Sequence, residues 1–142
     1  MNNERSKVKD PGIVFHKRIG IKEGYSIKLI NEPEKYSEVV GQFNGRITFQ
    51  KKLKEPVDLI HLFTKSKNEL SVELPYLKKY IKNNGSIWIS WPKRSSNAVS
   101  DLDSLMVRKI GMQNGLIAED ICSFDNTWFA IKLIQKTEGG SC

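Results

Sequence analysis

Residues 57–91 read VDLIHLFTKSKNELSVELPYLKKYIKNNGSIWISW, and this stretch decides the fold. Residues 57–63 are almost entirely apolar, which is typical of a strand covered on both faces of a sheet. Residues 86–91 have the same character and predict a second, central strand. Because a helical pattern lies between the two runs, the stretch predicts a strand–helix–strand unit with parallel strands.

The helix inside this unit has a start signal and a stop signal. Ser66 and Glu69 have the spacing of a capping box, with Ser66 as the N-cap residue. Pro75 lies inside the helical pattern and predicts a kink or a division of the helix. Asn84-Gly85 predicts the helix end, in a left-handed backbone conformation. The apolar stripe of this helix consists of Leu70, Leu74, Leu77 and Ile81.

The sequence before this unit predicts two helices and two strands. We expect a short helix at residues 13–19 and a first strand at residues 25–30. Pro33 can open a second helix that ends near Gly41. A short strand is expected at residues 46–50.

The sequence after this unit predicts a helix and a hairpin. Ser100 and Asp103 can cap the helix, which Asn114-Gly115 ends. Strands at residues 116–124 and 128–135 flank turn-forming residues, so they predict an antiparallel hairpin. The apolar stripe of this helix consists of Leu102, Leu105, Met106 and Ile110.

These elements together predict an α/β fold of three layers. Strands that alternate with helices indicate a parallel sheet with helices on both faces, and the terminal hairpin makes the sheet mixed. A chain of 142 residues fits one domain. We expect a flexible segment at residues 1–11, a single Rossmann-like domain at residues 12–136, and a flexible tail at residues 137–142.

The composition favours a cytoplasmic protein that does not engage a membrane. No apolar run approaches the ~20 residues of a membrane helix, and the polar start does not resemble a secretory signal. The two cysteines, Cys122 and Cys142, are expected to be reduced thiols. The net charge of +7 indicates attraction to anions, but the basic residues are spread along the chain.

Three stretches resemble an uncharacterised bacterial family, the domain of unknown function 3052. They are Leu29-Ile30-Asn31-Glu32-Pro33-Glu34-Lys35-Tyr36, then residues 57–63, then Gly85-Ser86-Ile87-Trp88-Ile89-Ser90-Trp91-Pro92-Lys93. The Trp-x-x-Trp-Pro-Lys element is the most specific, and Asp125, Thr127, Trp128 and Lys132-Leu133 also match. The resemblance implies a class I methyltransferase-like sheet of about six strands in the order second, first, third, fourth, sixth, fifth, with only the sixth antiparallel. It implies no activity.

The sequence lacks the usual cofactor motif of that fold. Such a sheet binds a nucleoside cofactor with glycines after the first strand and an acidic residue after the second. Here Asn31-Glu32-Pro33-Glu34 follows the first strand, and Gln50-Lys51-Lys52 follows the second. We therefore predict no cofactor and no S-adenosylmethionine binding at the usual place.

No catalytic or metal-binding motif stands out elsewhere. His16 and His61 are far apart, and no ligand spacing surrounds either cysteine. His61 is flanked by apolar residues on the same face of its strand, which favours a hydrogen-bonded core histidine over a general base. Cys122 is expected to pack as a small hydrophobe, and Ser90 lacks a nucleophile elbow.

The carboxyl ends of the parallel strands remain as the place for a ligand. Cations, hydroxyls and amides after the fourth strand suit an anion, whereas in the alternative interpretation the two tryptophans close the core and the loop is solvated. Asn31 and Glu32 lie at the same edge. The candidate anion- or ligand-binding residues are Thr64, Lys65, Ser66, Trp91, Lys93, Arg94, Ser95, Ser96 and Trp128.

Three functions stay open on this evidence. The leading hypothesis is a non-enzymatic binding or regulatory module that engages a small anion or a protein partner at this edge. The second is a degenerate or unusual methyltransferase-like enzyme. The third is a weak nucleic-acid-binding protein, which the charge favours although no nucleic-acid motif is present.

Overall fold

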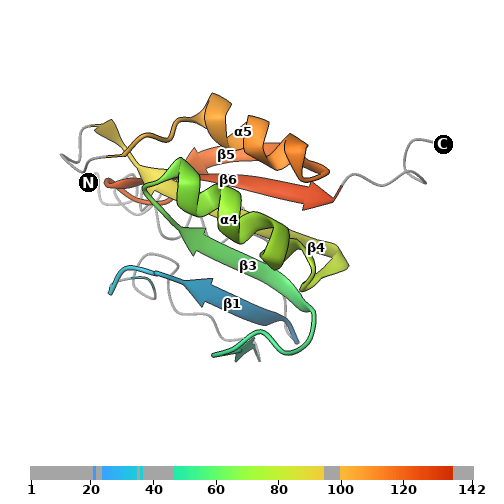
Figure 1. Cartoon of the computed structure of the whole chain (residues 1–142). Coiled ribbons are helices and arrows are strands. Elements are labelled where there is room, and N and C mark those ends of the chain that lie inside the picture. Colours follow the sequence, from blue (N-terminus) through green and yellow to red (C-terminus); the bar gives the residue numbers. More distant parts are fainter. Residues whose placement is uncertain (1–20, 22–23, 35, 37–46, 95–99, 136–142) are drawn as a thin grey trace, which may run out of the picture.

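The computed structural model describes residues 21, 24–34, 36, 47–94 and 100–135, and its strands form one mixed sheet (Figure 1). The sheet has six strands in the order β2-β1-β3-β4-β6-β5. β6 is antiparallel to both of its neighbours, while the pairs β1–β2, β1–β3 and β3–β4 are parallel. The fold class and strand order are therefore as predicted. The strands are β1 (Ser26–Ile30), β2 (Thr48–Phe49), β3 (Val57–Phe63), β4 (Ile81–Pro92), β5 (Leu116–Ser123) and β6 (Trp128–Gln135).

Two helices, α4 (Lys67–Lys78) and α5 (Ser104–Gln113), cover one face of this sheet (Figure 1). Their buried side chains pack against apolar residues of β3, β4 and β6, among them Ile60, Ile89 and Ile131. The opposite face carries a second apolar cluster that includes Trp88 and Phe124. Each fully buried aliphatic or aromatic side chain contributes roughly 1.5–3 kcal/mol, so both faces stabilise the sheet. The predicted helix at 13–19 and most of the one at 33–41 lie outside the described residues.

The start of α4 confirms half of the predicted capping box. Ser66 Oγ accepts a hydrogen bond from Glu69 N at 3.1 Å. The Glu69 carboxylate, however, accepts a hydrogen bond from Thr64 Oγ1, and Ser66 N donates to Thr64 Oγ1 at 3.3 Å. In a full capping box the Glu69 carboxylate would accept from Ser66 N. Here the Thr64 hydroxyl accepts from Ser66 N and donates to Glu69, so it bridges these two groups.

The end of α4 differs from the prediction. The helix ends at Lys78, and Pro75 lies inside its last turns without dividing it. Ile81 belongs to β4 and pairs with Val57, so it is not part of the helical stripe. The helix stops early because residues 79–80 must turn the chain back to bring Ile81 beside β3, whose Val57 N donates to Tyr80 O at 2.8 Å.

Asn84-Gly85 is part of β4 and not a left-handed helix cap. Its glycine is needed for a close approach of two backbones: a Cβ at Gly85 would lie 2.7 Å from the carbonyl oxygen of Asp58 and 2.9 Å from Ile81 Cγ1. The same region holds a register shift between β3 and β4. A glycine at a strand irregularity is a common arrangement, and the sequence alone did not distinguish it from a cap.

α5 begins where it was predicted, but its buried stripe is different. Asp103 Oδ1 accepts a hydrogen bond from Met106 N at 2.8 Å, and Gly115 follows the helix with φ +75°. Leu105 is 76% exposed, so its predicted place on the core stripe is wrong. The buried residues of α5 are Val107, Ile110 and Gly111.

The terminal hairpin lies at the carboxyl edge of the parallel strands. Asp125 Oδ1 accepts hydrogen bonds from the amides of Thr127 and Trp128, both at 2.8 Å, which closes the turn. Lys93 N donates to Thr127 O at 2.7 Å and ties the turn to the end of β4. In the part of the chain that the structure describes, no helix has the length and apolar character needed to cross a membrane.

Candidate functional site

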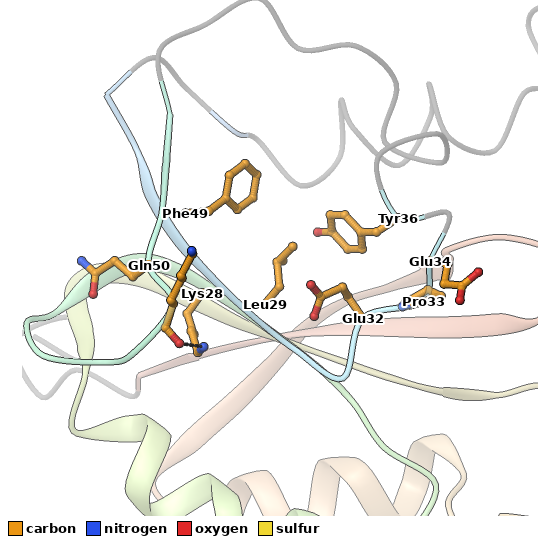
Figure 2. A pocket seen from close by; sticks show the side chains of 9 residues that line it. Lys28, Leu29, Glu32, Pro33, Glu34, Tyr36, Phe49 and Gln50 are labelled. Atoms are coloured by element: carbon orange, nitrogen blue, oxygen red, sulfur yellow. Dashed lines mark hydrogen bonds between the residues drawn. The ribbon is translucent and has the colours of Figure 1, made fainter.

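The carboxyl ends of β1 and β2 border a pocket of ≈ 790 Å³, here named the β1–β2 pocket. Figure 2 shows Leu29, Glu32, Tyr36 and Phe49 around a common space. Phe49 is 51% exposed at the end of β2. The lining residues are Lys28, Leu29, Glu32, Pro33, Glu34, Tyr36, Phe49, Gln50 and Lys51.

The turn that follows β1 shapes one side of this pocket. Asn31 has φ 59°, a left-handed conformation in which glycine is the usual residue. Asn31 Nδ2 donates to the carbonyl oxygen of Phe63 at 3.3 Å, which links the ends of β1 and β3. Asn31 thus adopts, directly after β1, a backbone conformation that usually requires glycine.

The charges around the β1–β2 pocket come from both strands. Lys28 Nζ donates to the backbone carbonyl of Lys51, so this ammonium group is held on the β2 side. Glu32 lies on the opposite side, after β1 (Figure 2). Burial, with the carboxylate of Glu32 as a second cause, raises the pKa of Tyr36 well above its ordinary value. The Tyr36 hydroxyl is therefore neutral at any physiological pH.

Tyr36 also connects the pocket to a buried polar chain. Its hydroxyl oxygen lies 3.1 Å from His61 Nδ1, and His61 Nε2 lies 2.7 Å from Ser90 Oγ. Burial lowers the pKa of His61 to about 3, so the ring is neutral and donates from one nitrogen while it accepts at the other. The ring stacks on Phe63 with centroids 4.2 Å apart. The structure thus confirms a hydrogen-bonded core histidine.

A second pocket of ≈ 440 Å³, here named the β4–α5 pocket, opens at the carboxyl end of β4. Three of the predicted site residues, Trp91, Lys93 and Arg94, come together in its wall. The indole of Trp91 is buried, whereas Arg94 is exposed. The other lining residues are Pro92, Leu102, Asp103, Ser104, Ile121 and Phe129.

The other predicted site residues lie elsewhere. Thr64 and Ser66 form the cap of α4, and the carbonyl oxygen of Lys65 accepts from Ser100 Oγ at 2.9 Å. Trp128 packs on the opposite face of the sheet, with its ring centroid 5.1 Å from that of Phe63. Ser95 and Ser96 lie outside the described residues.

Sequence reasoning found Trp91 but missed Phe129 of the β4–α5 pocket, and it missed Tyr36 and Phe49 of the β1–β2 pocket. Phe129, not Trp128, forms the apolar wall beside Lys93, because neighbouring residues of a strand point to opposite faces. The alternation of side chains along β6, aligned with that along β4, could have assigned Phe129 and Trp128 to opposite faces of the sheet. Tyr36 and Phe49 are distant in sequence from each other, and no motif links them.

Both pockets combine apolar side chains with charged ones. Among residues 24–34, 47–94 and 100–135, no three histidine, cysteine, aspartate or glutamate side chains are grouped to hold a metal ion. Cys122 is half-buried and packs on the apolar cluster around Trp88 and Phe124.

Comparison with solved structures finds proteins of the same fold among methyltransferases. The magnesium protoporphyrin IX methyltransferase of Synechocystis PCC 6803 with bound S-adenosylmethionine is similar with a TM-score of 0.58 and 13% identity, over 92% of this chain and 79% of that chain. The ribosomal protein L11 methylase of Lactobacillus delbrueckii subsp. bulgaricus is similar with a TM-score of 0.55 and 12% identity, over 89% and 77%. The precorrin-6y C5,15-methyltransferase of Geobacter metallireducens GS-15 is similar with a TM-score of 0.56 and 10% identity, over 87% of this chain and 86% of that chain.

These likenesses show the methyltransferase-type fold, which agrees with the fold expected from the sequence. A scan of protein-family models finds no match, and a search of curated proteins finds none either. The resemblance to the uncharacterised bacterial family is therefore not confirmed.

Proposed function

We propose that this chain is a methyltransferase-like protein that binds the adenosyl group of S-adenosylmethionine, or of its product S-adenosylhomocysteine, in the β1–β2 pocket. The observation that carries the proposal is the position of that pocket, at the carboxyl ends of β1 and β2. In α/β sheets of this kind ligands bind outside the carboxyl ends of the strands. Structural neighbours include methyltransferases with this cofactor or its product bound.

The side chains of the pocket suit an adenosyl group. Phe49 offers an exposed ring on which a purine can stack, and Leu29 adds apolar surface. The Glu32 carboxylate is an acceptor for two ribose hydroxyls, although it follows β1 and not β2. Asn31, in its left-handed conformation, makes the turn after β1 without a glycine.

Two features predict that the affinity is weak. Pro33 removes a backbone amide from the wall, and Lys51 stands where an acidic residue usually contacts the ribose. We expect a dissociation constant of about 100 µM, which corresponds to about −5.5 kcal/mol of binding free energy. Binding to the native state then raises the free energy of unfolding by about 1.4 kcal/mol at 1 mM ligand.

Thermal denaturation and titration calorimetry with S-adenosylhomocysteine test the proposal. The unmodified chain should be stabilised by 1 mM ligand, and Phe49→Ala or Glu32→Gln should remove most of that stabilisation. Leu105→Ala and Glu55→Gln are matched controls, because they change an exposed apolar residue and an exposed carboxylate outside the pocket. Both control variants should keep the stabilisation.

Two outcomes would contradict the proposal. The first is the absence of any stabilisation at 1 mM ligand, which would leave the sequence-based prediction of no cofactor binding in place. The second is binding that Phe49→Ala and Glu32→Gln do not weaken, which would place the ligand outside the β1–β2 pocket.

A further inference from the structure

We propose that the β4–α5 pocket is a second binding site, and that it takes a small organic anion with a flat apolar body. The pocket lies at the carboxyl edge of the sheet but shares no lining residue with the β1–β2 pocket. Trp91 and Leu102 belong to the apolar cluster under the helices, whereas Leu29 and Tyr36 belong to the cluster on the opposite face. The two pockets are therefore separate.

The floor of the β4–α5 pocket is apolar, with Trp91 buried and Phe129 and Ile121 accessible. The ring centroids of Trp91 and Phe129 lie 5.7 Å apart with planes tilted by 44°. Phe129 and Ile121 are each 38% exposed, so apolar surface faces water inside a concave site. A volume of ≈ 440 Å³ falls in the range of small-molecule sites. A flat apolar body placed there would remove this surface from water.

The rim of the same pocket carries positive charge. The Lys93 ammonium lies 5.3 Å from the centroid of the Phe129 ring and donates to Ser123 Oγ, so it is held directly beside the apolar floor. Arg94 adds a guanidinium group that can bind a carboxylate in a bidentate manner. The acidic side chain in the wall, Asp103, accepts from Met106 N and thus faces the first turn of α5.

The base of the pocket is held in place before any ligand binds. Pro92 is buried and fixes one backbone dihedral. The next residue, Lys93, donates its amide to Thr127 O at 2.7 Å, which fastens the end of β4 to the hairpin turn. A wall that is already ordered loses little conformational entropy on binding. The combination of an apolar floor, two cations and a fixed base favours a ligand that has both an apolar and an anionic part.

The test compares three probes that separate these parts. 2-Naphthoate has the flat body and the charge, 2-naphthylmethanol has the body alone, and inorganic phosphate has the charge alone. Titration of the ¹⁵N-labelled full chain gives an affinity for each probe and the amides that respond. We expect 2-naphthoate to bind at least tenfold more tightly than either other probe, with shifts centred on Trp91, Lys93 and Phe129.

Variants of Lys93 and Arg94 test whether these two cations account for the preference for 2-naphthoate over the uncharged 2-naphthylmethanol. Lys93→Ala with Arg94→Ala should weaken 2-naphthoate binding at least tenfold and leave 2-naphthylmethanol binding unchanged. Lys67→Ala with Lys109→Ala removes the same charge from exposed positions outside the pocket and should change neither affinity. Equal binding of 2-naphthoate and 2-naphthylmethanol, equal loss in both double variants, or responses centred on another part of the chain would each overturn the proposal.

Discussion

His61 is a titratable residue that lies within the apolar core. It is completely buried, both of its ring nitrogens lie within hydrogen-bond distance of a hydroxyl, and it stacks on Phe63. The sequence predicted a core histidine because apolar residues flank it on the same face of its strand. Its partners, Tyr36 and Ser90, could not be predicted, because they lie 25 and 29 residues away and no local pattern joins them.

Because of His61, the free energy of unfolding should decrease as the pH is lowered below 6.5. Its pKa is lowered from 6.5 to about 3 in the folded state, so below pH 6.5 the unfolded chain binds a proton that the folded chain does not. The stabilisation from neutral His61 is therefore complete above pH 6.5 and is lost as the pH falls toward 3. Between pH 7 and pH 5 this loss amounts to about 2 kcal/mol.

Urea denaturation of the unmodified chain and of His61→Gln measures this effect. Glutamine keeps a donor and an acceptor but does not titrate, and all other groups cancel in the difference between the two chains. The stability advantage of the unmodified chain should shrink by about 2 kcal/mol from pH 7 to pH 5. An advantage that stays constant, or that grows at low pH, would show that His61 accepts a proton in the folded protein.

At the scale of elements, α5 makes a clear prediction about packing. Leu105 is 76% exposed, whereas Ile110 is 5% exposed and packs on the sheet. Ile110→Ala should therefore destabilise the protein by about 2–5 kcal/mol, while Leu105→Ala should change stability by less than about 0.5 kcal/mol. Both changes remove a large aliphatic side chain from the same helix, so each controls for the other in chemical denaturation. Equal losses of stability in the two variants would mean that α5 turns a different face toward the sheet.

The elements show where sequence patterns are sufficient and where they fail. The residues of β3 form an almost entirely apolar run, so its bounds, Val57–Phe63, were predicted as they are observed. The boundary between α4 and β4 was wrong, because Ile81 fits the helical period and Asn84-Gly85 fits a helix cap. What decides that boundary is the pairing of Ile81 with Val57, a contact between segments 24 residues apart. Local periodicity contains no information about such a contact.

The candidate sites were predictable as an edge of the sheet but not as pockets. Strand direction alone placed Trp91, Lys93 and Arg94 together, because they lie at the carboxyl end of one strand. The β1–β2 pocket combines Tyr36 with Phe49, which belong to different segments and carry no motif. Pocket walls built from separate strands depend on register and on which face each residue occupies, and both come from tertiary packing.

At the scale of the molecule, the described elements should unfold in a single transition. The two apolar clusters share the same sheet, and β4 contributes Trp88 to one and Trp91 to the other. Tryptophan fluorescence therefore reports on the centre of the sheet, while far-ultraviolet circular dichroism reports mainly on the helices. We expect both signals to give the same midpoint in urea. Two separated midpoints would mean that α4 and α5 leave the sheet before it opens.

The insertion of β6 between β4 and β5 has a consequence for synthesis on the ribosome. β4, with the buried Ile87, Trp88 and Ile89, emerges well before the strand that completes its pairing. The next strand to emerge, β5, does not pair with β4 in the finished sheet, because β6 lies between them. Until residues 128–135 are made, the nascent chain therefore presents an open, apolar strand edge, which is the kind of surface that chaperones bind and that promotes aggregation.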